Sequence, residues 1–437
     1  MSRRWIFGLI GVGGVAVLAF LAVTWRPAIA PIEPPLPSTF RTDQVANGEK
    51  LAVAAGCIEC HTAKGGARGA GGVYADRGAS SAPSTNITPD PETGIGHWSL
   101  AAFSRALRKG VARDGSYLLP AFPFDHFTKL TDQDIGALYA YLMTLPPAKT
   151  PTASTGFRFQ RKIRALQAIW NAIYVELGVF QPDPARSAQW NRGAYLTEAV
   201  VLCSSCHTPR NMLGAEQAGH PYGSGRGAYG WWSAPLDIPV SPAHWTEAQM
   251  VEYLRTAESV PHGVALGDMQ KVVRALRVLP DSDIAAIATY IVSLARPGSP
   301  AREAAVAKAQ SATPPRNDME IGWSKIYLAH CAECHDRPGA TPQSARSPIG
   351  LATSLWMEEP NNFVRIMLDG IQREDGVPGP TMPGFRDKLN DYQMAAIASY
   401  LRTSRTVLTP WGDIEVMVGR IRAFSAAYVN ARQAPTR

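Results

Sequence analysis

Cysteine is scarce in this sequence: the 437 residues hold six, and all six fall within three short motifs. No cysteine is therefore left for a separate disulfide framework. The chain also lacks a serine–histidine–acid or paired-carboxylate pattern, which argues against substrate chemistry of its own. Its net charge is +7, but the lysines and arginines are scattered and form no basic stripe with interleaved aromatic residues, so we expect no nucleic-acid partner.

Glycine and proline, by contrast, are abundant, at 38 and 35 residues. Much of the chain must therefore be loop, although an apolar content of 46% is that of a globular protein. Such a composition suits small helices wrapped around a large apolar cofactor better than one continuous core.

The N-terminus carries two arginines and then an uncharged run from Trp5 to Trp25. A helix of this length covers roughly 30 Å, the thickness of a bilayer's hydrocarbon core. We expect a membrane anchor within residues 1–30, with the arginines in the cytoplasm. The alternative is a signal peptide cleaved after Ala30. Both interpretations place the rest of the chain at the periplasmic face of the bacterial inner membrane.

Each cysteine pair is a C-x-x-C followed at once by histidine. The three motifs are Cys57/Cys60/His61, Cys203/Cys206/His207 and Cys331/Cys334/His335. This spacing lets two thiols bond the vinyl groups of one porphyrin while the histidine ligates its iron. Zinc would need two pairs per metal, and these pairs lie far apart in the sequence. A thioredoxin-like site would need a βαβ context that is missing. We therefore predict three covalent haems c.

The surroundings of the three motifs repeat. Each motif follows a short helical stretch with an early glycine, namely Gly48, Gly193 and Gly322. Each is followed by an amphipathic helical pattern with acidic residues in its first turn, at residues 130–142, 279–291 and 389–401. A helix before and a helix after the haem is the arrangement of cytochrome c. The predicted fold is thus all-α, with three tandem cytochrome c domains and an N-terminal transmembrane helix.

The predicted boundaries follow from these repeats. They are an anchor or signal at 1–30, cytochrome c domains at 40–148, 186–298 and 317–406, a connector with an amphipathic helix at 149–185, a linker at 299–316 and an amphipathic tail at 407–437.

The sixth iron ligand is expected from the loop before each second helix. Met269 occupies that loop in the second unit and Met382 in the third, and we predict that both ligate iron. In the first unit Phe122 stands at this place, and phenylalanine cannot bind iron. We predict His126, which lies in the same loop; Met143, His97 and an open position are the alternatives. Two histidine ligands would lower the potential of the first haem.

Further segments carry a resemblance to a known family. They are residues 86–90, 94–99, 119–124, 137–142, 183–184, 190–195 and 206–214. They resemble the triple-haem cytochrome c subunits of periplasmic, membrane-bound dehydrogenases of acetic acid bacteria and related proteobacteria, over about residues 40–405. The resemblance implies that a catalytic dehydrogenase subunit oxidises the substrate, while this subunit passes the electrons to ubiquinone.

Residues 122–126 and 261–265 look more like the molybdenum-hydroxylase branch, which acts on aldehydes or nitrogen heterocycles. We therefore expect a molybdopterin-type partner, foremost an aldehyde dehydrogenase, with a small iron–sulfur subunit, and contact with membrane lipid. Cytochrome subunits of quinoprotein alcohol dehydrogenases or flavin-dependent gluconate or polyol dehydrogenases are the alternative. Two other classes are a haem enzyme with an open position at the first haem, and a subunit of a terminal oxidase.

Overall fold

The computed structural model describes residues 24–72, 74–75, 82–119, 121–150, 158–226, 230–237, 244–259, 262–295, 300, 303–304, 322–336, 349–372 and 381–433. The chain divides into two compact units. Unit 1 is Met1–Arg186 with Tyr195–Leu202, and unit 2 is Ser187–Ala194 with Cys203–Arg437. The predicted linker 299–316 lies almost wholly outside the described residues.

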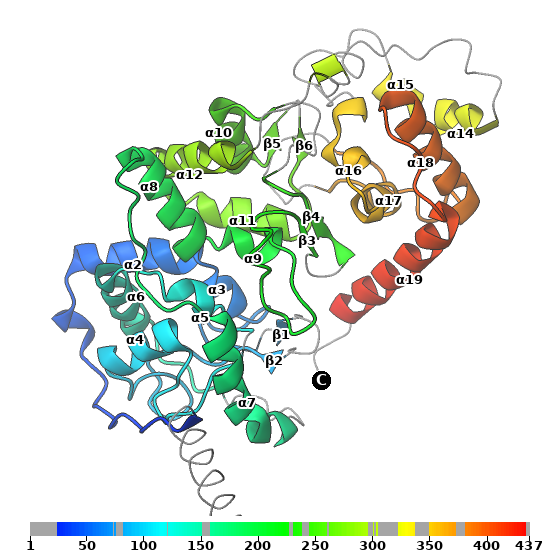
Figure 1. The fold of residues 1–437 in the computed structure, drawn as a ribbon. Helices are drawn as coiled ribbons and strands as arrows, with labels where there is room; N and C mark the ends of the chain where they lie inside the picture. The colour runs from blue at the N-terminus through cyan, green and yellow to red at the C-terminus, as the bar shows by residue number, and fades with distance from the viewer. Residues whose placement is uncertain are drawn as a thin grey trace, which may run out of the picture. The chain divides into compact units, whose positions relative to one another are not determined.

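Unit 1 consists mostly of short helices joined by long loops (Figure 1). Its elements are η1 (Pro37–Thr39), α2 (Thr42–Ala54), α3 (Cys57–Cys60), β1 (Tyr74–Ala75), β2 (Ala82–Pro83), α4 (Leu100–Lys109), α5 (Phe124–Phe127), α6 (Asp132–Thr144), α7 (Arg158–Tyr174) and η3 (Leu196–Val200).

Unit 2 contains the second and third motifs. Its elements are α8 (Ala188–Tyr195, the last residue belonging to unit 1), α9 (Cys203–His207), β3 (Gly225–Arg226), β4 (Trp232–Ser233), α10 (Glu247–Thr256), β5 (Glu258–Ser259), β6 (Gly263–Val264), α11 (Asp268–Leu276), α12 (Asp281–Leu294), α14 (Gly322–His330), α15 (Ala332–His335), η7 (Ile349–Leu351), α16 (Thr353–Trp356), α17 (Asn361–Asp369), α18 (Asp391–Arg405) and α19 (Ile414–Gln433). We call residues 203–295 the second attachment region and residues 322–433 the third.

In each unit a glycine lets two helices cross in close contact. A Cβ added to Gly48 of α2 would lie 1.9 Å from the carbonyl oxygen of Ala137 on α6. A Cβ added to Gly193 of α8 would lie 1.9 Å from the same atom of Ala286 on α12. Any side chain larger than hydrogen would push these helices apart. The early glycines of the first two repeats therefore mark helix crossings.

The three helices predicted after the motifs are present as α6, α12 and α18, and each begins where its sequence signals it. The Thr131 hydroxyl accepts a hydrogen bond from the amide of Asp134 at the start of α6. At α18, Asn390 and Gln393 form a reciprocal capping box. The apolar stripe of α6 is buried: Ile135, Leu138 and Leu142 are all under 3% exposed.

The prediction of an all-α fold is wrong, because the described residues form three two-stranded antiparallel sheets: β1–β2, β3–β4 and β5–β6. The first two pairs follow attachment motifs, and the third precedes Met269. In these pairs the backbone amides and carbonyls bond between strands instead of within a helix. Each strand has only two residues, so it is too short to show the alternating pattern by which a sequence indicates a strand.

The prediction of an N-terminal transmembrane helix, and with it of anchoring at the inner membrane, is also corrected. Within the described part of the chain, no helix is both long and apolar enough to cross a membrane. Residues 1–23, on which the prediction mainly rested, lie outside the described residues.

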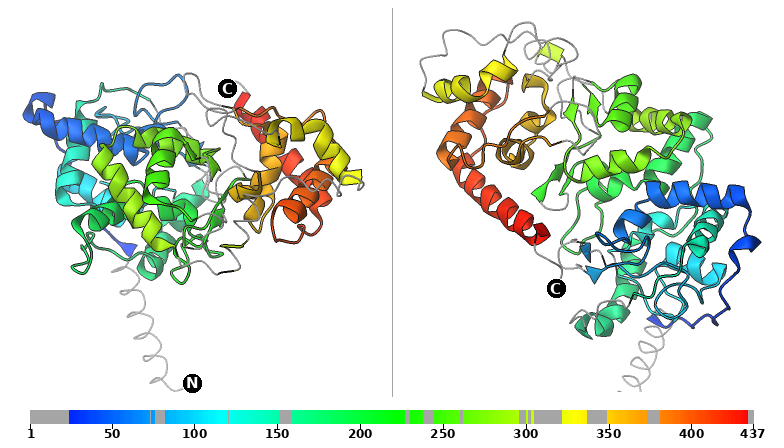
Figure 2. Two further views of the ribbon diagram at one scale, coloured as in Figure 1. Left: turned by 90° about the horizontal axis from the view of Figure 1, so that it is seen from above. Right: turned by 180° about the vertical axis from the view of Figure 1, so that it is seen from behind.

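The two amphipathic segments found in the sequence are both helical. In α7, Ala168 packs against Val111 and Tyr117 of unit 1, whereas Leu166 and Ile173 are 56% and 66% exposed. The C-terminal segment forms α19, which packs against α17 and α18 of the third attachment region (Figure 2). Val418 and Ile421 of α19 belong to the core of that region.

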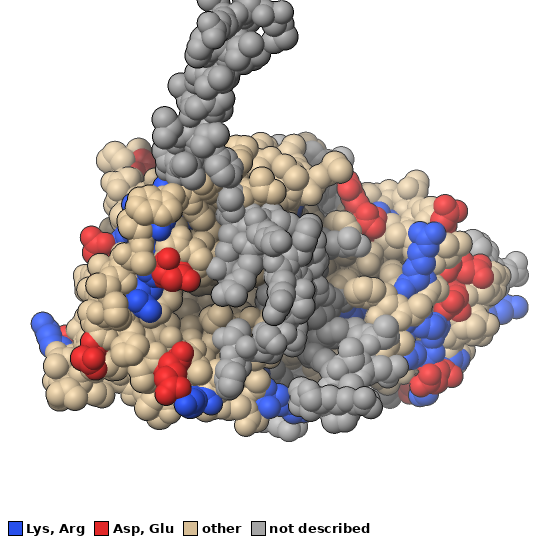
Figure 3. Space-filling model, turned by 90° about the horizontal axis from the view of Figure 1, so that it is seen from below, with Lys and Arg blue, Asp and Glu red and all other residues tan. Residues whose placement is uncertain are grey.

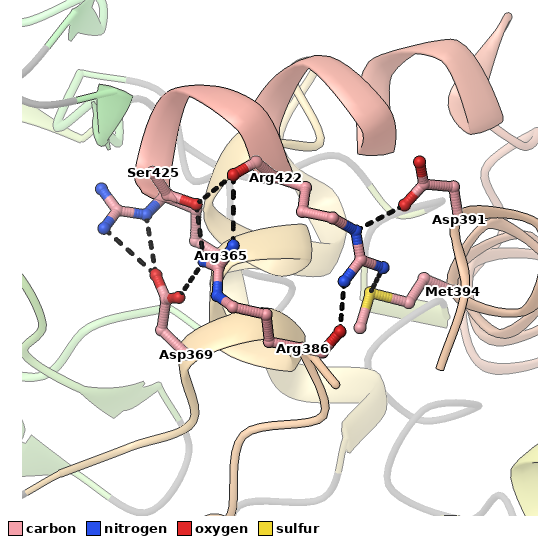
Figure 4. A network of polar contacts seen from close by, with 7 residues as sticks. All are labelled: Arg365, Asp369, Arg386, Asp391, Met394, Arg422 and Ser425. Atoms are coloured by element: carbon pink, nitrogen blue, oxygen red, sulfur yellow. Dashed lines mark hydrogen bonds and ion pairs between the residues drawn. The ribbon is translucent and has the colours of Figure 1, made fainter. Parts of the chain in front are cut away.

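Arginine side chains fix α19 in place (Figure 4). Arg422 donates to the carboxylate of Asp391 at 2.6 Å, to the carbonyl of Leu389 at 2.8 Å and to the carbonyl of Arg386. Arg386 in turn donates to Ser425 at 2.6 Å and to Asp369. These contacts tie the helix to the loop between α17 and α18.

Replacing Arg422 with leucine should therefore destabilise the third attachment region. The carboxylate of Asp391 and two backbone carbonyls would lose a charged donor, which costs about 1–3 kcal/mol. Chemical denaturation of the intact protein should show the loss. Arg420→Leu is the matched control, since Arg420 is exposed on the same helix. Equal stability of the two variants would contradict this assignment of Arg422.

Candidate haem-attachment sites

The first two motifs each form one short helical turn. Cys57–Cys60 is α3, and His61 follows as its C-terminal residue. Gly56 precedes this turn with φ of 72°, which lets the chain leave α2 and start a new helix at once. Cys203–His207 forms the corresponding helix α9. Both cysteines and the histidine of a motif are therefore carried by a single turn, which suits attachment to one porphyrin.

The two histidines have the same hydrogen bond. The Nδ1 of His61 lies 2.6 Å from the carbonyl oxygen of Thr85, and the Nδ1 of His207 lies 2.6 Å from that of Ala234. A carbonyl can only accept, so Nδ1 carries the proton and Nε2 keeps its lone pair. Desolvation lowers the pKa of both imidazoles, which keeps them neutral at neutral pH. A neutral ring with an oriented Nε2 is what iron ligation requires.

The cysteines fit thioether bonding better than dithiol redox chemistry. All six lie in the described part of the chain, and none forms a disulfide. Burial and the neighbouring cysteine raise the pKa of Cys57 and Cys203 to about 12 and that of Cys331 to about 11. A thioredoxin-type cysteine needs a lowered pKa, because the thiolate is the nucleophile. The structure thus argues against the thioredoxin alternative.

The two cysteines of a motif are not equivalent, although the sequence assigned them the same role. The first cysteine is half-buried in all three motifs, whereas the second, Cys60, Cys206 or Cys334, is exposed. The Sγ of Cys206 lies 3.9 Å from the hydroxyl of Ser205, and the amide of Cys334 donates to the carbonyl of Cys331 at 3.1 Å. Bonding of Cys206 and Cys334 to haem stays a prediction, as it does for the other four cysteines.

The third motif differs in its surroundings. Cys331 is the N-terminal cap of α15 (Ala332–His335), and the next residue after this helix, Asp336, forms an ion pair with Arg405 of α18 at 2.8 Å. Both side chains of this pair are largely buried, at 11% and 3% exposed. This ion pair links the C-terminal end of the third motif to α18. No local sequence signal indicates it, because the partners are far apart in the chain.

The two predicted methionine ligands lie in the second and third attachment regions, but Met269, expected in a loop, is on a helix. Met269 is the second residue of α11 and packs against the cluster of Ala257, Ala265 and Val273. Met382 packs against the core of the third region, and its backbone forms a bridge with Ile371 through bonds of 2.9 and 3.1 Å. Their role as iron ligands stays a prediction.

His126 of the first unit is 5% exposed and lies on α5. Its Nδ1 is 3.2 Å from the carbonyl oxygen of Glu198, and its Nε2 is 3.9 Å from a carboxylate oxygen of Asp125. Glu198 belongs to η3, the helical turn that leads into the second motif. Of the alternatives, Met143 is buried within α6, and His97 bonds the carbonyl of Ile32 at 2.8 Å. The sixth ligand at this site also stays a prediction.

Hydrogen bonds hold the loop of residues 86–95 in place. Asn86 accepts from both the amide and the hydroxyl of Thr88 and donates to the carbonyl of Ala148 at 2.6 Å. Asp90 caps the turn at Thr93, and these hydrogen bonds lower the pKa of its carboxyl. This packed loop directly follows Thr85, the acceptor of His61, and so fixes the acceptor's position.

Charged side chains of the described residues are interspersed on the face drawn in Figure 3, with basic and acidic groups near one another. Corresponding ion pairs join α4 to the start of α6 (Arg108–Asp132) and α10 to the start of α12 (Arg255–Asp281). Partly exposed pairs of this kind contribute little to stability. They show that the two repeats share this local contact.

Comparison with known proteins gives concordant results. The family model for cytochrome c matches residues 45–146, and the model for subunit III of cbb3-type cytochrome c oxidase matches residues 322–401. The chain is 40% identical to a nicotinate dehydrogenase subunit of Pseudomonas putida over 97% of its own length, and it spans 36% of that relative. It thus covers about a third of this longer protein.

Two relatives of similar length are also matched. The fructose dehydrogenase cytochrome subunit of Gluconobacter japonicus is 33% identical, over 88% of this chain and 82% of the relative. The gluconate 2-dehydrogenase cytochrome c subunit of Pantoea cypripedii is 34% identical, over 84% of this chain and 86% of the relative.

Replacing Met269 or Met382 with leucine should leave all covalent attachments intact but remove one sulfur ligand each. We expect either variant to lose about half of the methionine-to-iron charge-transfer band in the near infrared and to lower one haem potential. Absorption and redox titration of the oxidised protein measure both. Met417→Leu is the control, because this methionine packs on the third core from α19. An unchanged band in Met269→Leu would exclude Met269 as a ligand.

Proposed function

The chain belongs to the family of cytochrome c subunits of alcohol, gluconate, fructose and nicotinate dehydrogenases, and we propose that it is the electron-transfer subunit of such a complex. It holds three covalent haems c in this proposal, one at each C-x-x-C-H motif. The observation that carries it is the shared geometry of His61 and His207, each held by a backbone carbonyl with Nε2 left for iron.

Haem c supplies one-electron exchange at a fixed potential, and the residues of this chain set the conditions. The cysteines would bond the porphyrin and the histidines would ligate its iron. Met269 and Met382 are proposed as further ligands of the second and third irons, and His126 as that of the first. The apolar cores around α6, α12 and α18 would exclude water from the haems, which affects their potential.

The partner is proposed to be a dehydrogenase of the molybdenum-hydroxylase type with a small iron–sulfur subunit. Such an enzyme inserts an oxygen atom from water into a C–H bond of an aldehyde or nitrogen heterocycle, releasing two electrons and two protons. The similarity to a nicotinate dehydrogenase subunit supports this type, since nicotinate is a nitrogen heterocycle. The two electrons would then reduce ubiquinone, which takes up two protons to form ubiquinol.

Purification of the native complex tests this proposal. We expect a copurifying large subunit that contains molybdenum, and reduction of the cytochrome when its substrate is added. A flavin or pyrroloquinoline quinone in the large subunit would overturn the molybdenum partner. Carbon monoxide binding to the ferrous protein would overturn the assignment of a pure relay, because it reveals an open iron position.

The number of haems can be tested on this chain alone. Replacing both Cys203 and Cys206 with alanine should remove one covalent haem, because both thioether bonds of the second site are lost. Mass spectrometry of the mature chain and a haem assay should show a fall from three haems to two. Met212→Ala is the control, since Met212 is fully exposed shortly after the same motif. An unchanged haem mass in the double variant would contradict attachment at this motif.

A further inference from the structure

Trp231 contacts two elements of unit 2 that are far apart in the sequence. Its indole packs on Gly267: a Cβ added to this glycine would lie 2.6 Å from both Cδ1 and Nε1 of the ring. The guanidinium carbon of Arg365 lies 4.4 Å from the ring centroid. Gly267 belongs to the second attachment region, and Arg365, on α17, belongs to the third.

The Gly267 side of this contact is the start of α11. Gly267 is the N-terminal cap of α11, with φ of 59°, a conformation that favours glycine. Met269 follows two residues later on the first turn of the helix. The indole therefore lies against the residue at which α11 starts, and the start of this helix determines the position of Met269. A change in the position of Trp231 must displace this turn or leave a gap beside it.

The backbone next to Trp231 is bound to α17. The amide of Trp232 donates to Oδ1 of Asn362 at 2.9 Å, and Nδ2 of Asn362 donates to the carbonyl of Trp232 at 2.7 Å. One side chain thus satisfies both backbone groups of Trp232, as a neighbouring strand would. Asn362 is the second residue of α17. The start of α17 therefore fixes the backbone from which the indole projects.

The middle of α17 contacts the Trp231 ring through Arg365. The Arg365 side chain is only 6% exposed, and its Nε and Nη2 both lie 3.2 Å from Oδ2 of Asp369. Asp369 also accepts from Arg386, which bonds Ser425 of α19 (Figure 4). The network thus orients a nearly buried cation against an aromatic ring, where the cation–π attraction is strongest.

The end of α17 supports the other predicted methionine. Gly370 follows the helix, and a Cβ added to it would lie 2.3 Å from the carbonyl oxygen of Met382. Ile371, the next residue, exchanges two backbone hydrogen bonds with Met382. The same helix therefore supports Met382 directly and Met269 through Trp231 and Gly267.

We propose that Trp231 is a positioning residue for the second haem site, and that through it α17 acts as a common support for both methionine ligands. This inference rests on the proposed function, because it requires haems at these two sites. It implies that a substitution in the third attachment region changes methionine ligation in the second. Neither Trp231 nor Asn362 is part of an attachment motif, so both can be replaced without removing a haem bond.

The test uses the full chain with its haems and three variants. Trp231→Leu should lose about half of the near-infrared methionine-to-iron band, whereas Trp231→Phe, which keeps a ring against Gly267, should retain most of it. Asn362→Ala removes the support from the third region. It should raise amide hydrogen exchange in residues 267–276 by on the order of tenfold and lower the potential of one haem. Asn362→Ala also keeps the test decisive if Trp231→Leu fails to fold.

Trp190→Phe is the control, because Trp190 packs on Tyr290 and bonds Ser293 of α12, away from α11. It should leave the band and the exchange of residues 267–276 unchanged. A band unaffected by both Trp231→Leu and Asn362→Ala would overturn the inference and leave the proposed function intact. A wild-type chain without covalent haem would instead overturn the proposed function, so the two failures are distinguishable by the haem assay.

Discussion

The close crossing of two helices at a glycine is the constraint on which the first two attachment sites depend. Where Gly48 meets Ala137 and Gly193 meets Ala286, the backbones touch, so the angle and height of the crossing cannot vary. Each motif begins nine or ten residues after its glycine, so the crossing limits where the motif can lie against the second helix. The loops then complete the site, since the carbonyls of Thr85 and Ala234 accept from His61 and His207.

The sequence predicted those parts of the fold that depend on local pattern. The helices α6, α12 and α18 follow from their apolar stripes and first-turn acids, and the motifs from cysteine spacing. Two-residue strands such as β3 and β4 leave no such pattern, and the all-α prediction failed on them. The unequal exposure of paired cysteines such as Cys203 and Cys206 was not foreseen either, because spacing alone does not say which thiol faces the solvent. The sequence could not identify the carbonyl groups that accept from His61 and His207 either, since a backbone acceptor needs no particular side chain.

The spanning helix expected from the apolar run of residues 5–25 is not among the described helices, which begin at Thr24. The amphipathic C-terminal helix shows a limit of hydropathy as evidence. Its pattern predicted a buried face, and the structure shows that Val418 and Ile421 are covered by the chain's own third region. An amphipathic pattern predicts that a face is buried and does not say against what.

Distance in the sequence explains why the role of α17 could not be foreseen. This helix contributes no predicted haem ligand and carries no motif, yet its start binds Trp232, its middle faces Trp231 and its end abuts Met382. Each contact joins residues that no local pattern relates. If one rigid helix supports the segments that carry Met269 and Met382, then neither segment can move without disturbing the other. The positions of both methionines would then depend on the same helix, although the two sites look independent in the sequence.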